Sequence, residues 1–114
     1  LEDLSVPCAG DIVKPAISWQ VLPALIRRHL RPGGVAVFNL FPPPGGKWNP
    51  EFQEIVGLFK TARIIRFDTF ENRLLVAGDA LPTARKLGRD LRDALLQLGS
   101  RQARRIHLQT TSAE

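Results

Sequence analysis

The residues of this chain that could do chemistry lie in or beside two short loops, each of which we expect to follow a strand. Asp3 and Ser5 belong to the first loop, and Asn39 interrupts an apolar run just before the second. A loop carboxylate can accept a proton, a serine hydroxyl can hydrogen-bond a substrate, and a buried amide demands partners. Each residue also has a plainer interpretation, because Asp3 and Ser5 can form turns with their own backbone and Asn39 can satisfy nearby loop backbone. We predict that the two loops lie at one rim of a sheet and form a wall of a pocket.

Other motifs carry less chemistry. Gly45-Gly46-Lys47 matches a phosphate-binding loop only in part, because Trp48 stands where a Ser or Thr is needed. His29 and His107 have no second ligand at metal spacing, so we expect no metal site. Cys8 is the single cysteine, which excludes an internal disulfide, and no histidine lies near it in sequence to activate the thiol.

Helical periodicity marks three stretches of the chain. The first is amphipathic, and Pro23 within it means that the helix either begins nearer Gln20 than Ser18 or bends. Pro32 and Gly33 then form a stop signal. The predicted helices run from Ser18 to Leu30 and from Asn49 to Phe59, and a third starts after Pro82 or Thr83 and ends at Gly99.

Three runs have the composition of strands. Residues 35–41 are almost without a polar residue, which is typical of a strand covered by helices on both faces. Residues 62–68 and 72–77 are separated by only a few residues and predict a hairpin. A helix between two strands implies a parallel crossover, so the hairpin would add an antiparallel strand at the sheet edge. Residues 1–16 predict the end of a strand followed by a loop.

The apolar run at residues 35–41 poses a physical difficulty. A strand this apolar normally lies inside a sheet, yet the chain offers it at most two or three partners, and an open edge would template aggregation. We therefore expect strands that precede Leu1 in a longer polypeptide to cover that edge. The sequence contains no Met and opens abruptly, which also indicates a piece of a longer or processed protein.

Size and charge limit the classes of function. The 114 residues, 44% apolar and 24% charged, fit one globular domain, and no apolar run is long enough to span a membrane. Most of the net charge of +5 lies in residues 82–114, with seven Lys or Arg against three Asp or Glu. We expect residues 1–99 to form the domain and residues 100–114 to be a basic, disordered tail, with a strand at Arg105 to Gln109 as the alternative.

Four segments together resemble a known fold. They are Leu1–Pro7 (LEDLSVP), the helix after it, Leu30–Val37 (LRPGGVAV) and the hairpin around Phe67–Val76. Over about residues 1–80 they are similar to the second half of a class I S-adenosylmethionine-dependent methyltransferase, and most similar to the spermidine synthase-like family. The resemblance implies an α/β fold, the C-terminal half of a Rossmann-like methyltransferase sheet. In it, a parallel strand with flanking helices is followed by an antiparallel edge hairpin and a C-terminal helix.

The first segment carries the chemistry that the resemblance implies. Aminopropyltransferases have Asp-Ser-Ser-Asp-Pro after their fourth strand, and here Asp3, Ser5 and Pro7 fall on its first, third and fifth residues. The resemblance makes Asp3 the base that takes the amine proton, with Ser5 and Asn39 beside the substrate. Val6 stands where the second Asp helps to hold a polyamine, so a desolvated amine would lack an ion-pair partner there.

The resemblance implies a transferase that uses S-adenosylmethionine or its decarboxylated form. It would move a methyl or aminopropyl group to a small acceptor such as a polyamine, in a cytoplasmic homo-oligomer. The glycine-rich loop and the ribose-binding acid of such folds precede Leu1, so we expect the cofactor-binding residues upstream and this chain alone to be inactive. Two other functions stay open: a non-catalytic scaffold domain, suggested by Val6, and nucleic-acid binding through Arg85 to Arg105. The second is disfavoured by alternating charge signs and by the lack of aromatic residues in that stretch.

Overall fold

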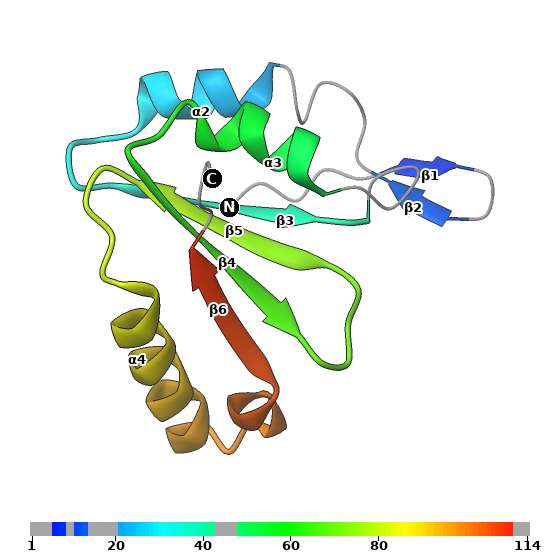
Figure 1. The fold of residues 1–114 in the computed structure, drawn as a ribbon, viewed down its shortest axis with the longest axis vertical. Helices are drawn as coiled ribbons and strands as arrows, with labels where there is room; N and C mark the ends of the chain where they lie inside the picture. The colour runs from blue at the N-terminus through cyan, green and yellow to red at the C-terminus, as the bar shows by residue number, and fades with distance from the viewer. Residues whose placement is uncertain (1–5, 9–10, 14–20, 43–47, 111–114) are drawn as a thin grey trace.

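The computed structural model describes residues 6–8, 11–13, 21–42 and 48–110 of the chain (Figure 1). The first two of these segments, β1 (Val6–Cys8) and β2 (Asp11–Val13), pair as an antiparallel two-stranded sheet. The sequence predicted only the end of a strand and a loop here. The difference arises because strands of three residues are too short to show a periodicity.

The first described helix, α2 (Leu22–His29), begins later than either Ser18 or Gln20. Pro23 falls in its first turn, where a backbone N–H has no partner within the helix, so the proline sets the start of α2 and no bend is needed. Basic residues fill the last turn, as the helix dipole favours. Gly33 then adopts a positive φ of 76°, a left-handed conformation that lets the chain turn into the next strand.

The main sheet has four strands in the order β3-β5-β4-β6, and every adjacent pair is antiparallel. Its strands are β3 (Val35–Leu40), β4 (Thr61–Phe67), β5 (Arg73–Gly78) and β6 (Ile106–Thr110). The prediction of a parallel, Rossmann-like methyltransferase sheet is therefore wrong for this part of the chain. The helix α3 (Asn49–Val56) does join β3 to β4, and those two strands point the same way, but β5 lies between them and pairs with both (Figure 1).

β3 lies at one end of this sheet, and β5 is its one strand partner among the described residues. The sequence predicted instead a strand inside the sheet and covered on both faces. Burial alternates along β3, because Ala36, Phe38 and Leu40 are buried whereas Val35 is 50% exposed. The apolar sequence thus gives one fully buried face and one that is partly open. That strands before Leu1 cover the edge of β3 stays a prediction.

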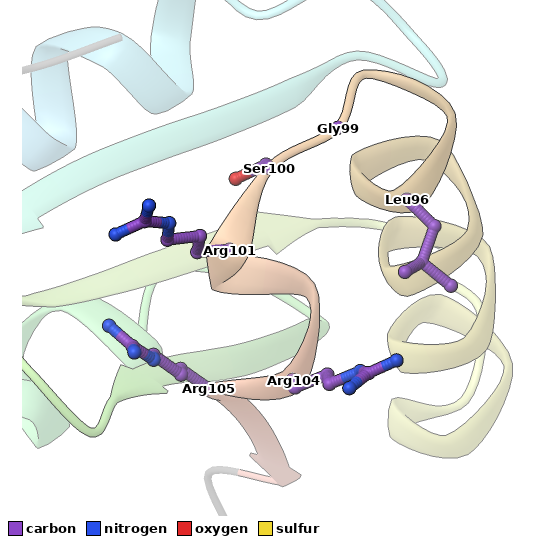
Figure 2. A pocket seen from close by; sticks show the side chains of 6 residues that line it. All are labelled: Leu96, Gly99, Ser100, Arg101, Arg104 and Arg105. Carbon is purple, nitrogen blue, oxygen red and sulfur yellow. The ribbon is translucent and has the colours of Figure 1, made fainter.

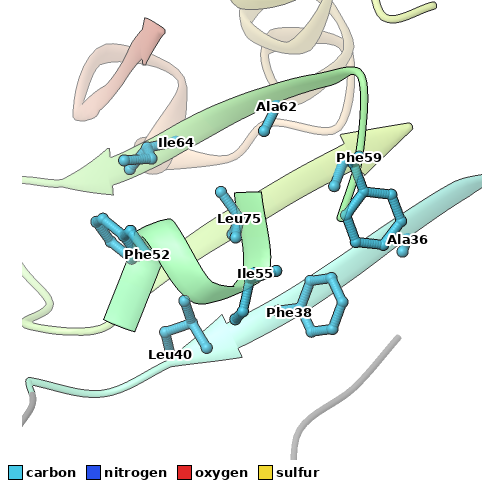
Figure 3. Close-up of a cluster of buried hydrophobic side chains, with 10 residues drawn as sticks. Ala36, Phe38, Leu40, Phe52, Ile55, Phe59, Ala62, Ile64 and Leu75 are labelled. Atoms are coloured by element: carbon cyan, nitrogen blue, oxygen red, sulfur yellow. The ribbon is translucent and has the colours of Figure 1, made fainter. Parts of the chain in front are cut away.

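The core lies between one face of the sheet and the helices α2 and α3. Phe52 and Ile55 of α3 pack over Phe38 of β3 and Leu75 of β5 (Figure 3). The rings of Phe38 and Phe59 meet edge to face, with centroids 6.1 Å apart. α3 ends at Val56 and not at Phe59, although Phe59 is still buried in the core. This core fixes the strand ends at which the candidate site lies.

The opposite side of β4 and β6 carries the predicted C-terminal helix, α4 (Ala84–Gln97). It begins as predicted after Thr83, whose hydroxyl accepts a hydrogen bond from the Lys86 N–H over 3.1 Å. Gly88 is buried where α4 approaches β6, and a Cβ there would lie 3.5 Å from a methyl group of Leu108. No helix among the described residues is long and apolar enough to cross a membrane.

The basic tail is ordered over most of its length. Residues 101–104 form the short helix η2, and β6 follows it and pairs with β4. The expectation of disorder is therefore wrong for residues 101–110, and the alternative strand at Arg105 to Gln109 agrees with β6 to within one residue at each end. Hydrophobic periodicity could not distinguish a disordered tail from a strand here, because β6 is partly exposed and its pairing with β4 specifies it.

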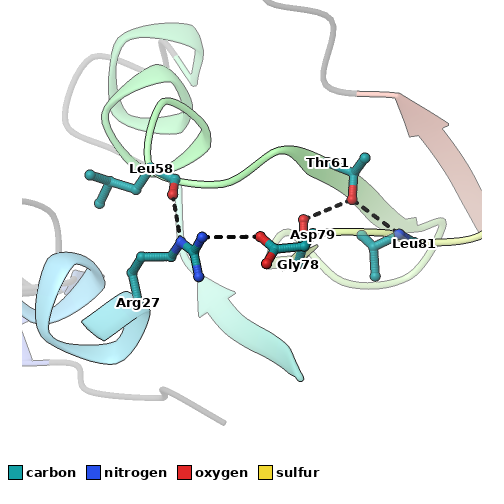
Figure 4. A network of polar contacts seen from close by, with 6 residues as sticks. All are labelled: Arg27, Leu58, Thr61, Gly78, Asp79 and Leu81. Carbon is teal, nitrogen blue, oxygen red and sulfur yellow. Dashed lines mark hydrogen bonds and ion pairs between the residues drawn. The ribbon is translucent and has the colours of Figure 1, made fainter. Parts of the chain in front are cut away.

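A polar network joins α2 to the amino end of β4 and the carboxyl end of β5 (Figure 4). Arg27 lies 3.1 Å from the Asp79 carboxylate and donates from Nε to the Leu58 carbonyl, also over 3.1 Å. The Thr61 hydroxyl donates to the Gly78 carbonyl over 2.8 Å. This network occupies the end of the sheet opposite to the carboxyl ends of β3 and β4.

Candidate functional site

A pocket of about 290 Å³ lies where β3 and β4 end and β5 begins. The carboxyl ends of β3 and β4 share this edge because both strands are antiparallel to β5 (Figure 1). The pocket, here called the rim pocket, is built from the loop after β3, the residue before α3 and the turn between β4 and β5. Its lining residues are Pro42, Trp48, Arg66, Phe67, Phe70, Glu71, Asn72 and Arg73.

Arg73 and Trp48 form one wall of the rim pocket. The guanidinium carbon of Arg73 lies 4.6 Å from the centroid of the Trp48 ring, a cation–π contact. Trp48 itself packs against Phe52, with ring centroids 5.1 Å apart. Arg73 pairs with Leu40 across the sheet, so the pleat directs its side chain to the face that α3 covers. The core therefore holds the Arg73 guanidinium in a fixed place.

A second wall is aromatic. The rings of Phe67 and Phe70 meet edge to face, with centroids 5.9 Å apart. Phe67 is the last residue of β4, and Phe70 lies in the turn that follows, where 56% of its surface is exposed. An exposed ring held by a neighbouring ring offers a flat apolar surface to a ligand.

Asn39 is the one predicted site residue that the structure describes. It is half-buried near the end of β3, and its side-chain oxygen accepts a hydrogen bond from the Asn72 amide over 2.8 Å. Asn72 lines the rim pocket, whereas Asn39 does not. Asn39 therefore holds the β4–β5 turn through Asn72. This structural role is closer to the interpretation that Asn39 supports a neighbouring loop than to direct contact with a substrate.

The other predicted site residues lie outside the described part of the chain. Asp3 and Ser5 belong to residues 1–5. Gly45-Gly46-Lys47, which the sequence disfavours as a phosphate-binding loop, also lies outside the described residues. Their relation to the rim pocket is thus untested. Of the second predicted loop, Pro42 lies in the pocket wall.

The rim pocket carries an excess of positive charge. Arg66 and Arg73 line it against one acidic residue, Glu71, and none of the three takes part in an ion pair among the described residues. Burial, and then the positive charge of Arg66, lowers the pKa of Arg73. The fold therefore holds two like charges near each other.

Sequence reasoning did not single out Arg66 and Arg73. Their positions in the sequence could have indicated them. Arg66 is the second-last residue of β4 and Arg73 is the first residue of β5, so the two flank the predicted hairpin turn. In an antiparallel pair such residues lie near each other, so two cations there should have suggested a shared site.

The cofactor implied by the resemblance does not fit the rim pocket. S-adenosylmethionine and its decarboxylated form both carry a sulfonium cation, which would face the guanidinium groups of Arg66 and Arg73. The residues that hold the cofactor stay predicted upstream of Leu1. Among the described residues there is also no group of three His, Cys, Asp or Glu side chains that could hold a metal ion.

A second pocket, of about 400 Å³, lies between the end of α4 and η2 (Figure 2). Arg101 and Arg105 extend to the same side of η2, and Arg104 extends toward α4 (Figure 2). None of the three forms an ion pair among the described residues. Leu96 and Ser100 complete the lining together with Gly99. Three of the arginines in the stretch considered for nucleic-acid binding thus line one pocket, but their side chains do not all point in the same direction.

Comparison with known proteins gives no relative for this chain. No family model, no curated protein and no solved structure matches it.

Proposed function

We propose that this chain is the acceptor-binding part of a spermidine synthase-like transferase. The protein would transfer a methyl or aminopropyl group from S-adenosylmethionine or its decarboxylated form to a small acceptor. The support from the sequence is the resemblance of residues 1–80 to that family. The support from the structure is the rim pocket, and this observation carries the proposal.

The rim pocket has the features of a small-molecule site. It is concave, aromatic rings form part of its walls, and polar and charged groups project into it from strand ends and a turn that the core supports. Asn39, chosen from the sequence as a pocket residue, holds the turn that contributes Asn72 to the lining. The site therefore lies at the carboxyl end of β3, the strand that carries Asn39.

The partly covered β3 supports the idea that the transferase is longer than this chain. Val35 is half-exposed and the outer edge of β3 has no partner among the described strands. Additional strands upstream would cover that edge and bring the cofactor-binding residues. In this proposal the chain alone is inactive, and the complete protein works in the cytoplasm as a homo-oligomer.

The test uses the complete polypeptide that the gene encodes. Transfer from each of the two cofactors is measured for the wild type, for Asp3→Asn, and for Asp11→Asn as a matched control. If Asp3 is the base, Asp3→Asn lowers kcat by about 100-fold or more, the scale of general-base catalysis, while Asp11→Asn has no effect. Full activity of Asp3→Asn would exclude Asp3 as the base.

The scaffold alternative has its own readout. Calorimetric titration of the complete protein with both cofactors gives heat if the protein is a transferase. Absence of heat at high cofactor concentration, together with absence of transfer, would favour a domain that has lost the chemistry.

A second candidate function comes from the α4–η2 pocket. Three arginines without carboxylate partners among the described residues suit the phosphates of a nucleic acid. Binding to a DNA duplex should then weaken steeply between low and moderate salt, and Arg104→Gln should weaken it further. An affinity that does not change with salt would remove this candidate.

A further inference from the structure

The rim pocket combines three features that restrict its ligand: two guanidinium groups, flat aromatic walls and a fixed geometry. The carboxylate of Glu71 offsets part of the positive charge, but it forms no ion pair with either arginine. The pocket is therefore positive overall. A polyamine, which carries several positive charges, would be repelled by it.

Arg73 is the group best placed to bind an anion. Its cation–π contact with Trp48 holds the guanidinium at one wall, and the planar fork of a guanidinium matches a carboxylate with two parallel hydrogen bonds. The pKa of Arg73 is lowered by burial and by Arg66. An anion bound between the two arginines would compensate both the burial of the Arg73 charge and its repulsion by Arg66. The pocket with a bound anion is therefore electrostatically more favourable than the pocket without one.

The aromatic residues add a requirement on shape. Phe70 leaves more than half of its surface open, and Phe67 holds its ring edge to face. A planar ring can pack on such a surface, whereas a flexible aliphatic chain gains less from it. The size of the pocket, about 290 Å³, suits a molecule of one ring and not a dinucleotide.

We propose that the rim pocket binds a small planar carboxylate, such as a substituted benzoate, with Arg66 and Arg73 at the carboxylate and the aromatic wall against the ring. Binding itself requires only the described residues. That this ligand is the acceptor of the transferase rests on the function proposed above, and it makes the acceptor an aromatic acid in place of a polyamine. The loss of the family's second Asp at Val6 agrees with this change of acceptor.

The test is calorimetric titration of the full chain with four probes: 4-aminobenzoate, its neutral amide 4-aminobenzamide, spermidine and inorganic phosphate. We expect 4-aminobenzoate to bind measurably and at least about tenfold more tightly than 4-aminobenzamide, the loss that corresponds to one charge-assisted hydrogen bond. Spermidine should not bind at this site. Phosphate, which lacks a ring, should bind more weakly than 4-aminobenzoate.

Variants locate the binding. Arg73→Gln and Arg66→Gln should each weaken 4-aminobenzoate binding about tenfold. Arg28→Gln, an exposed arginine on α2 outside both pockets, serves as the matched control and should have no effect. Arg66 is exposed near the end of β4, so Arg66→Gln remains informative even if Arg73→Gln disturbs folding.

Each outcome bears on the proposal. No binding of 4-aminobenzoate, equal binding of its amide, or unchanged binding in Arg66→Gln would overturn it. Phosphate binding as tightly as 4-aminobenzoate would overturn the requirement for a ring, and spermidine binding that depends on Arg66 would overturn the charge argument. Binding of 4-aminobenzoate without any transfer by the complete protein would leave the pocket assignment standing and refute the transferase.

Discussion

Replacing Arg27 by alanine should destabilise the fold by about 2 kcal/mol, because this one side chain makes three different contacts. Its ion pair with Asp79 is 3.1 Å long, but each side chain is about one-third exposed, so screening limits the pair to about 0.5–1 kcal/mol. The hydrogen bond to the Leu58 carbonyl contributes about 1 kcal/mol. The guanidinium carbon lies 5.9 Å from the Phe59 ring centroid, near the limit of a cation–π contact worth about 0.5 kcal/mol.

The assay is urea unfolding followed by circular dichroism, with the free energy of unfolding extrapolated to water. Arg28→Ala, an exposed arginine on the same helix, is the matched control and should change stability by less than about 0.5 kcal/mol. A double-mutant cycle with Asp79→Asn should give a coupling energy of about 0.5–1 kcal/mol. If Arg27→Ala is as mild as Arg28→Ala, or if the cycle shows no coupling, the network in Figure 4 does not hold α2 in place.

Three further predictions concern the core and α4. Phe38→Ala removes a ring that is fully buried and should lower the free energy of unfolding by about 3–5 kcal/mol in urea titrations; wild-type stability would contradict the packing described for β3. Thr83→Ala removes the N-cap of α4 and should cost about 1 kcal/mol, with Thr83→Ser restoring most of it in thermal melts; an equal loss in both variants would argue against the cap. The hydrogen bond from Lys86, 2.7 Å long, lowers the pKa of Asp90 below its usual value, so the charged carboxylate stabilises the fold above the pKa of the unfolded chain. That contribution is lost as pH falls through the folded pKa. The melting temperature of the wild type should therefore lie slightly above that of Asp90→Asn near neutral pH and equal it in acid below the folded pKa. A difference that does not vary with pH would count against the Lys86 pair.

Local patterns predicted the individual elements well. The stop signal at Gly33, the hairpin of β4 and β5, and the start of α4 after Thr83 all depend on residues close in sequence, and the structure confirms them. The prediction of the strand order was wrong because that order depends on residues far apart in sequence. β5 pairs with β3 as well as with β4, and no pattern within either strand indicates a partner more than thirty residues away.

The candidate site shows the same limit. Asn39 could be chosen because an amide in an apolar run needs partners, and Asn72 is one of them. Arg66, Arg73 and Trp48 come together only through the sheet register and the packing of α3. A cation at a strand end has no local feature that separates it from an ordinary surface residue.

The central place of β5 has a consequence for the order in which the chain folds. Ile65 pairs with Leu74 nine residues later, whereas Leu40 pairs with Arg73 thirty-three residues later. Closing the longer loop costs about 1 kcal/mol more in chain entropy, so the hairpin should form first and β3 should dock afterwards. Amide protons of β3 should then exchange with solvent sooner than those of β5 that bond to β4, and substitutions confined to β3 should speed unfolding while leaving the folding rate nearly unchanged.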